Sequence, residues 1–198
     1  MDINMKKLLS ALTLAAGLLS PALQASQTPL MFSTIDGFNV PNAENVTGVR
    51  LAVFHGRVNQ VKGLDVAAFG LSETNKTTGL NLNLFGAAKV NQEMTGASLG
   101  IVNWQEGNTV GANIGAVNLT NNVKGANVSF VNYSTGHTLV DVGAVSFSQQ
   151  STVQVGLFNK TTQLDGIQVG LLNCADNGFF KCFPFVNWSK DLSVKISN

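Results

Sequence analysis

The stretch "GASLGIVNWQEGNTVGANIGAVNLTNNVKGANVSFVN", residues 96–132, contains one short pattern three times. Each copy opens on glycine, alternates apolar residues with small or polar ones, and closes on asparagine. The copies begin at Gly96, Gly111 and Gly125 and end at Asn103, Asn118 and Asn132. Self-similarity at a nearly fixed spacing is the sequence signature of a repeat fold.

The pattern extends in both directions from this stretch and gives ten copies in all. Four further copies keep the opening glycine, at Gly48, Gly63, Gly79 and Gly166. Three others lack it and begin at Asp141, Thr152 and Phe180. The closing asparagine recurs at Asn159, Asn173 and Asn187. We therefore predict that these glycines and asparagines are structural residues of the repeat.

Alternation with a period of two predicts β-strands, and repeated glycines would each cost a helix about 1 kcal/mol. A strand of about eight residues spans ~26 Å, and the short polar runs between copies rarely cover that distance on a return path. The sequence therefore predicts an all-β fold, an antiparallel meander of about ten short strands that is curled or closed into a barrel. A β-solenoid is the alternative, because coiled β-folds also stack Asn and Gly.

The two faces of these strands differ. In the copy at Gly166, Ile167 and Val169 lie on an apolar face, and Gln168 lies on a small and polar one. An outward apolar face would suit lipid, although three apolar residues cover only roughly 13–17 Å against a band of ~25 Å in known membrane barrels. An inward apolar face would instead give a greasy interior. Both arrangements remain open.

The N-terminus has the features of a secretory signal peptide. Lys6 and Lys7 precede the apolar run of residues 8–23, and small residues near Ala25 fit a cleavage site. A membrane anchor is the alternative. We divide the chain into a signal peptide (1–25), a lead-in segment (26–45) and a repeat β-domain (46–198). In an oxidising compartment, Cys174 and Cys182 are expected to form a disulfide, with two free thiols as the alternative.

The chain contains few sequence motifs that indicate catalysis or ligand binding. Charged residues make up 12% of it and the formal net charge is +1, which argues against nucleic acid as a partner. "GASLG", residues 96–100, fits the G-x-S-x-G motif of serine hydrolases. Ser98, however, occupies a repeat position that holds Asn113 in the next copy, whereas a nucleophile would be unique. We expect no catalytic residue, no metal site and no cofactor.

The units "GIQVGLLN" and "TVQVGLFN" and the closing "FPFVNWS" resemble repeats in a group of uncharacterised bacterial envelope proteins, the secreted surface-repeat proteins. The resemblance covers about residues 46–189, and the copies at Gly48 and Gly63 depart from it because they lack the Asn and the Gln. It implies export and a repeat β-fold, and it supplies no reaction.

These observations predict a non-enzymatic exported protein of the outer membrane or cell surface, with outer-membrane lipid or another envelope protein as partner. The alternative is a soluble periplasmic β-barrel that binds a small apolar ligand. A serine hydrolase is the third hypothesis.

Overall fold

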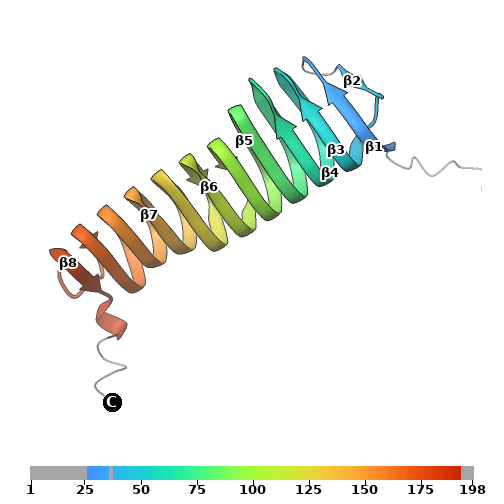
Figure 1. Ribbon diagram of the computed structural model, residues 1–198. Helices are drawn as coiled ribbons and strands as arrows, with labels where there is room; N and C mark the ends of the chain where they lie inside the picture. Colours follow the sequence, from blue (N-terminus) through green and yellow to red (C-terminus); the bar gives the residue numbers. More distant parts are fainter. Residues whose placement is uncertain (1–25, 36–37, 193–198) are drawn as a thin grey trace, which may run out of the picture.

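The repeats coil about a common axis, and each coil lies directly on the one before it (Figure 1). The computed structural model describes residues 26–35 and 38–192. The predicted signal peptide, residues 1–25, lies outside the described residues. The strands are β1 (Gln27–Ser33), β2 (Asn39–Val40), β3 (Asn45–Ala52), β4 (His55–Ala67), β5 (Leu71–Gln105), β6 (Asn108–Thr120), β7 (Asn122–Ala175) and β8 (Cys182–Trp188).

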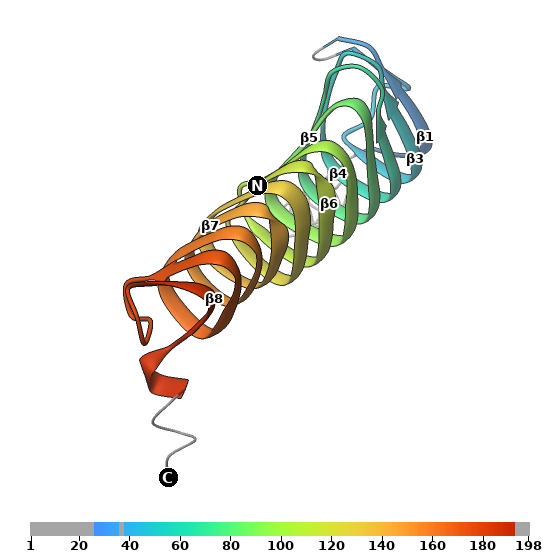
Figure 2. The ribbon, with the colours of Figure 1, turned by 60° about the vertical axis from the view of Figure 1, so that its left-hand side comes forward.

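The strands form one sheet in the order β2-β1-β3-β4-β5-β6-β7-β8. Pairing is parallel from β1 to β7, and like repeat positions meet: Gly48 lies beside Gly63, and Gly63 beside Gly79. The same register brings Gly96 beside Gly111 and Gly111 beside Gly125. The molecule is therefore a β-solenoid, and Figure 2 shows its coils as a stack of flattened rings.

The prediction of an antiparallel meander or barrel was wrong, because its argument treated the short polar runs as loops. They are strand residues instead. β5 and β7 run through several coils without a break, and the chain turns at corners occupied by small residues such as Gly115 and Gly143. Each coil has two sides formed by strand residues, and the chain returns along the second side. No separate loop therefore has to span the length of a strand.

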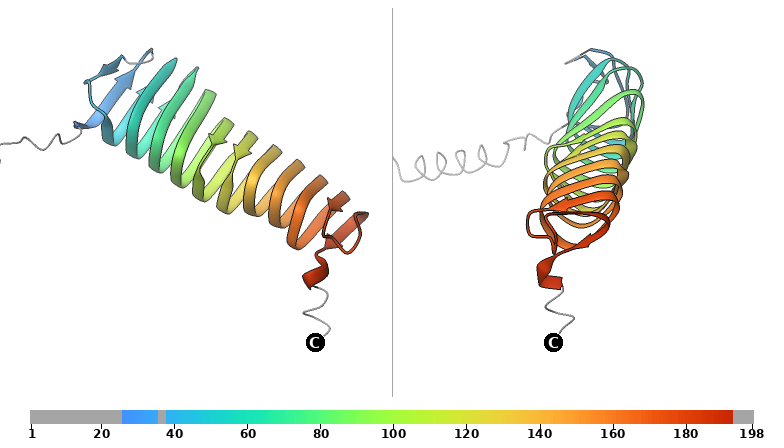
Figure 3. Two further views of the ribbon diagram at one scale, coloured as in Figure 1. Left: turned by 180° about the vertical axis from the view of Figure 1, so that it is seen from behind. Right: turned by 90° about the vertical axis from the view of Figure 1, so that its left-hand side faces the viewer.

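The coils shorten toward the C-terminus. Arg57 and Glu73, hydrogen-bonded neighbours near the N-terminal end, are 16 residues apart, whereas Ser148 and Thr161 are 13 apart. Figure 3 shows the resulting elongated rod, with β1 and β2 at one end and β8 at the other.

Both ends of the sheet are closed by antiparallel strands. β2 pairs with β1 at one end, and β8 pairs with residues 167–174 of β7 at the other. Because an open sheet edge recruits other strands, these caps protect the solenoid from end-to-end association. The segment predicted as a lead-in, residues 26–45, contains β1 and β2.

Candidate functional site

Within each coil, side chains alternate between the interior and the surface. Counting the opening glycine of a repeat as position 1, positions 3, 5 and 8 point inward and positions 2, 4, 6 and 7 point outward. Position 3 forms a column that we call the inner polar column. Its members, each at most 1% exposed, are Arg50, Asp65, Asn81, Ser98, Asn113, Asn127, Asp141, Gln154 and Gln168. The interior therefore contains a column of polar side chains beside buried apolar ones such as Val46, Val61 and Met94.

Position 8 forms a second buried column, the asparagine column, and its side chains bond from coil to coil. Nδ2 of Asn103 donates to Oδ1 of Asn118 at 2.8 Å, and Nδ2 of Asn118 donates to Oδ1 of Asn132 at 3.0 Å. Asn159 donates to Asn173 in the same way at 2.8 Å. Because an amide carries both a donor and an acceptor, identical residues satisfy one another along the stack. This is the physical reason for the repeated asparagine.

The inner polar column changes its direction of donation at Asp141. Asn113 donates to Asn127 at 2.9 Å and Asn127 to Asp141 at 2.9 Å, whereas Gln168 donates the opposite way along the chain, to Gln154 at 2.7 Å. Burial raises the pKa of Asp141 above its ordinary value, although hydrogen bonds from Thr138, Asn127 and Gln154 oppose the rise.

At the N-terminal end of this column an ion pair takes the place of the amides. Nε of Arg50 lies 2.8 Å from Oδ1 of Asp65, and Nη2 lies 3.0 Å from Oδ2. Both side chains are buried, and Ser72 hydrogen-bonds to both. A buried pair of this bidentate geometry fixes the register of the first coils, since either partner alone would be an uncompensated charge.

The glycines at position 1 are required by close packing. Gly111 has φ +140°, and a Cβ atom there would lie 1.8 Å from the backbone oxygen of Gly96. The glycines at 48, 63, 79, 96 and 125 repeat this contact with the coil before them. The last glycine of the predicted set, Gly166, lies against Thr152 instead, where the opening glycine is absent.

Ser98 takes part in the interior network. Its hydroxyl donates to Oδ1 of Asn103 at 2.6 Å, and the side chain is fully buried. The downstream histidine, His137, lies beside Thr152 and 3.5 Å from Asp165. Thus the structure places the G-x-S-x-G serine in a stack of structural residues and not at a strand-to-helix turn.

The disulfide between Cys174 and Cys182 is present and joins β7 to the cap strand β8. Asn187 is buried but does not extend the asparagine column. β8 runs antiparallel, so Asn187 lies beside Gln168, and its amide bonds to the backbone of Phe180. The tenth copy therefore matches the repeat in composition but forms the antiparallel strand that caps the last coil.

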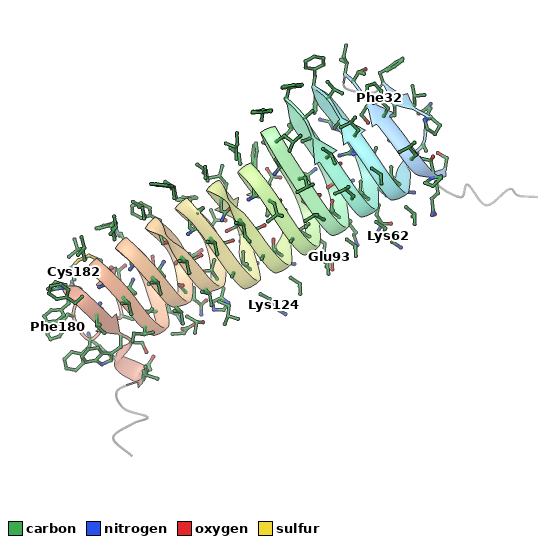
Figure 4. The ribbon with its side chains drawn as sticks, viewed as in Figure 1. Phe32, Lys62, Glu93, Lys124, Phe180 and Cys182 are labelled. Carbon is green, nitrogen blue, oxygen red and sulfur yellow. A yellow bond between two sulfur atoms is a disulfide. The ribbon has the colours of Figure 1, made fainter. Side chains whose placement is uncertain are left out.

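The outward positions carry an unbroken apolar surface. The bonds from Asn127 to Asp141 and from Asn132 to Ser146 place Asp141 at position 3, so this repeat begins at Leu139 and not at Asp141 as predicted. With that register, positions 2, 4, 6 and 7 are apolar in every repeat that begins between residues 48 and 166. We call this surface the apolar face. Its most exposed members are Phe54, Phe69, Leu84, Phe85, Phe130, Leu157 and Leu171. In Figure 4, Phe32 lies along one edge of the rod, and Lys62, Glu93 and Lys124 lie along the opposite edge. The surface is therefore amphipathic.

A charged cluster lies at the N-terminal end, where Glu73 bonds to Arg57 at 2.9 Å and to Asn91 at 3.1 Å. Burial alone would raise the pKa of Glu73, but these hydrogen bonds and the charges of Arg57 and Lys89 lower it below its ordinary value. Across residues 26–35 and 38–192, no group of three His, Cys, Asp or Glu side chains is placed to hold a metal ion. The described chain also has no helix that is long and apolar enough to cross a membrane.

The sequence indicated the two faces of each strand but not which one lies inside, and it did not reveal that the polar runs between copies form a second wall. The alternation of Trp104, Gln105 and Glu106 was the available signal for that wall. Comparison of the chain with models of protein families, with curated proteins and with solved structures found no match.

Proposed function

We propose that this protein is a non-enzymatic, exported envelope protein that lies on the surface of the outer membrane, with its apolar face against lipid. The observation that carries this proposal is the inverted distribution of side chains. Two polar columns run through the interior, whereas large apolar side chains such as Phe85 and Phe130, 69% and 74% exposed, lie on the outside. Contiguous apolar surface of this extent marks an interaction site in a soluble protein.

The shape of the apolar face favours lipid over a rigid partner. Positions 2 and 4 lie before the corner at position 5, and positions 6 and 7 lie after it, so the face turns through a corner of each coil. A second copy of the chain would cover one plane of this surface, whereas fluid lipid conforms to both. Parallel pairing between coils also satisfies the backbone polar groups, which a lipid environment requires.

The chemistry of the rest of the chain is consistent with this position. The disulfide between Cys174 and Cys182 fits an oxidising compartment. The charged side chains of Lys62, Glu93 and Lys124 extend from the edge opposite Phe32 (Figure 4) and would remain in water. An elongated amphipathic body of this kind lies in the plane of an interface, with only its apolar side chains inserted.

Flotation with vesicles of phosphatidylethanolamine and phosphatidylglycerol tests the proposal. The triple variant Phe85→Ser, Phe130→Ser, Leu157→Ser removes exposed side chains only, so it should fold normally. Each buried apolar side chain contributes about 1.5–3 kcal/mol, and we expect at least tenfold weaker partitioning. The control variant Lys62→Ser, Glu93→Ser should float like the parent protein.

Two results would reject lipid as the partner. The first is parent protein that stays at the bottom of the gradient with these vesicles. The second is a stable dimer in sedimentation equilibrium that the triple variant abolishes, which would assign the apolar face to a second copy.

A further inference from the structure

A second surface lies beyond the asparagine column, on the flank of the solenoid. The three residues that follow each column member point outward, inward and outward in turn. The first outward residues are Trp104, Leu119, Tyr133, Phe147 and Lys160. The inward residues are Gln105, Thr120, Ser134, Ser148 and Thr161. The second outward residues are Glu106, Asn121, Thr135, Gln149 and Thr162. Two outward rows thus border a floor formed by the strand between them.

The two rows border two neighbouring hollows, which together we call the flank groove. One hollow of about 330 Å³ is lined by Trp104, Leu119, Tyr133 and Thr135, among others. The other, of about 320 Å³, also includes Tyr133 and Thr135 and extends to Lys160. The hollows therefore follow one another along the solenoid axis, with the coil of Tyr133 and Thr135 between them.

The walls of the flank groove differ in chemistry. One wall is aromatic, with Trp104 38% and Tyr133 50% exposed, and the smaller Leu119 lies between them in the register. Coils are ~4.8 Å apart, so two of them separate Trp104 from Tyr133 by ~9.6 Å, which is comparable to the length of a disaccharide. The rings therefore flank a notch above Leu119.

The opposite wall is polar and mostly uncharged. The side chains of Gln149 and Thr162 make no hydrogen bond with any residue that the structure describes, so their donors and acceptors face solvent. Charges lie only toward the two ends of the lining, at Glu106 and Lys160, and Glu106 is paired with Lys89 at 3.2 Å. The middle of the groove thus offers aromatic rings on one side and neutral hydrogen-bonding groups on the other.

We propose that the flank groove binds an extended, neutral, β-linked glycan. A pyranose ring has an apolar C–H face, which stacks on aromatic rings, and hydroxyl groups at its edge, which amides and hydroxyls bind. Two hollows follow one another along the axis, so the surface suits neighbouring units of a polymer better than a single sugar. An extended peptide fits less well, because the backbone groups of the floor are already paired between coils and cannot add a strand.

The test uses the full-length protein with Trp188→Phe as background, which leaves Trp104 as the reporter because the sequence has two tryptophans. Cellohexaose and chitohexaose are titrated, with maltohexaose, a curved glycan, as the shape control. We expect a saturable change in Trp104 fluorescence with at least one β-linked hexasaccharide, confirmed by calorimetry. Tyr133→Ala should weaken binding about tenfold through the lost stacking surface. Leu119→Trp, which fills the notch, should abolish it.

Phe85→Ala, on the apolar face, is the matched control and should bind glycan like the background protein. The triple variant that loses lipid binding should also keep glycan binding, so the two proposals fail separately. No saturable binding of either β-linked hexasaccharide would overturn the inference. So would equal binding of maltohexaose, or unchanged binding in folded Tyr133→Ala and Leu119→Trp.

Discussion

Nδ2 of Asn127 donates a 2.9 Å hydrogen bond to Oδ1 of Asp141 in the next coil, and Asp141 is the point where donation along the inner polar column reverses. A carboxylate only accepts, so it receives bonds from Asn127 on one side and from Gln154 on the other. An asparagine oxygen could also accept two bonds, as Oδ1 of Asn103 does from Asn83 and Ser98, and it would carry no charge. At Asp141 the column therefore carries a buried carboxyl group in place of a neutral amide.

Asp141→Asn should stabilise the protein at neutral pH. Burial raises the pKa of Asp141, so the folded state favours the protonated carboxyl group. The protein therefore loses stability as the pH rises from the pKa of this group in the unfolded chain to its raised pKa in the folded chain. The variant removes this loss, and we expect a gain of about 1–3 kcal/mol in urea unfolding at pH 7. The gain should shrink toward pH 4. Asp165→Asn, at the surface, is the control, and a variant less stable than the parent at pH 7 would contradict this account.

Asn118→Ala should be among the most damaging substitutions of a polar side chain. It removes both ladder bonds of this coil, and Nδ2 of Asn103 keeps only its bond to the Ile114 carbonyl while Oδ1 of Asn132 keeps only the one from Ser129. The combined loss of bonds and volume should lower the free energy of unfolding by about 2–4 kcal/mol in chemical denaturation. Asn122→Ala breaks an exposed bond of the same kind, to Asn108, and should cost about 0.5 kcal/mol or less. Equal losses would show that burial of the ladder does not matter.

Gly111→Ala should prevent normal folding, because its Cβ would lie 1.8 Å from a backbone oxygen and φ is positive. The backbone of the preceding coil, at Gly96, cannot move without disturbing the whole stack, and we expect a loss of about 4 kcal/mol or more. Gly136→Ala is the matched control. Its Cβ would first meet the side-chain oxygens of Asn121 and Asn122, which can rotate away. Soluble expression and thermal unfolding, followed by circular dichroism, compare the two variants.

The sequence contained the side-chain pattern of the fold but not the path of the chain. The alternation of Ile167, Gln168 and Val169 predicted opposite faces, and the structure buries Gln168 completely while Val169 is 39% exposed. Strand direction was lost because the polar runs looked like loops, although Ser148 and Thr161 in such runs bond across coils at 3.1 Å. Short-range patterns do not distinguish a strand residue at a corner from a turn.

The same limit explains the two features of the surface that the sequence did not define. Trp104 and Tyr133 are 29 residues apart in the sequence, and only the coil register, which sets Leu119 between them, brings them to the same part of the surface. Asn187 matched the repeat in composition, yet the reversal between Cys174 and Cys182 turns its strand antiparallel. Both outcomes depend on which segments pair, and pairing is decided by the whole stack.

The disulfide should matter for the cap and little for the coils. Cys174 and Cys182 are 8 residues apart, and closing so short a loop stabilises the folded state by about 2.5 kcal/mol in the chain-entropy description. The double variant Cys174→Ser, Cys182→Ser should therefore release β8 locally. Hydrogen exchange should speed up for the amides of β8 and of residues 167–174 while those of β6 keep their protection.

Phe183 and Trp188 belong to the aromatic cluster over the cap. Release of the cap should expose the edge of the last coil. Since an exposed sheet edge recruits other strands, the variant should also self-associate, which light scattering would detect. If the variant instead stays monomeric and hydrogen exchange in β8 is unchanged, the aromatic cluster alone holds the cap in place.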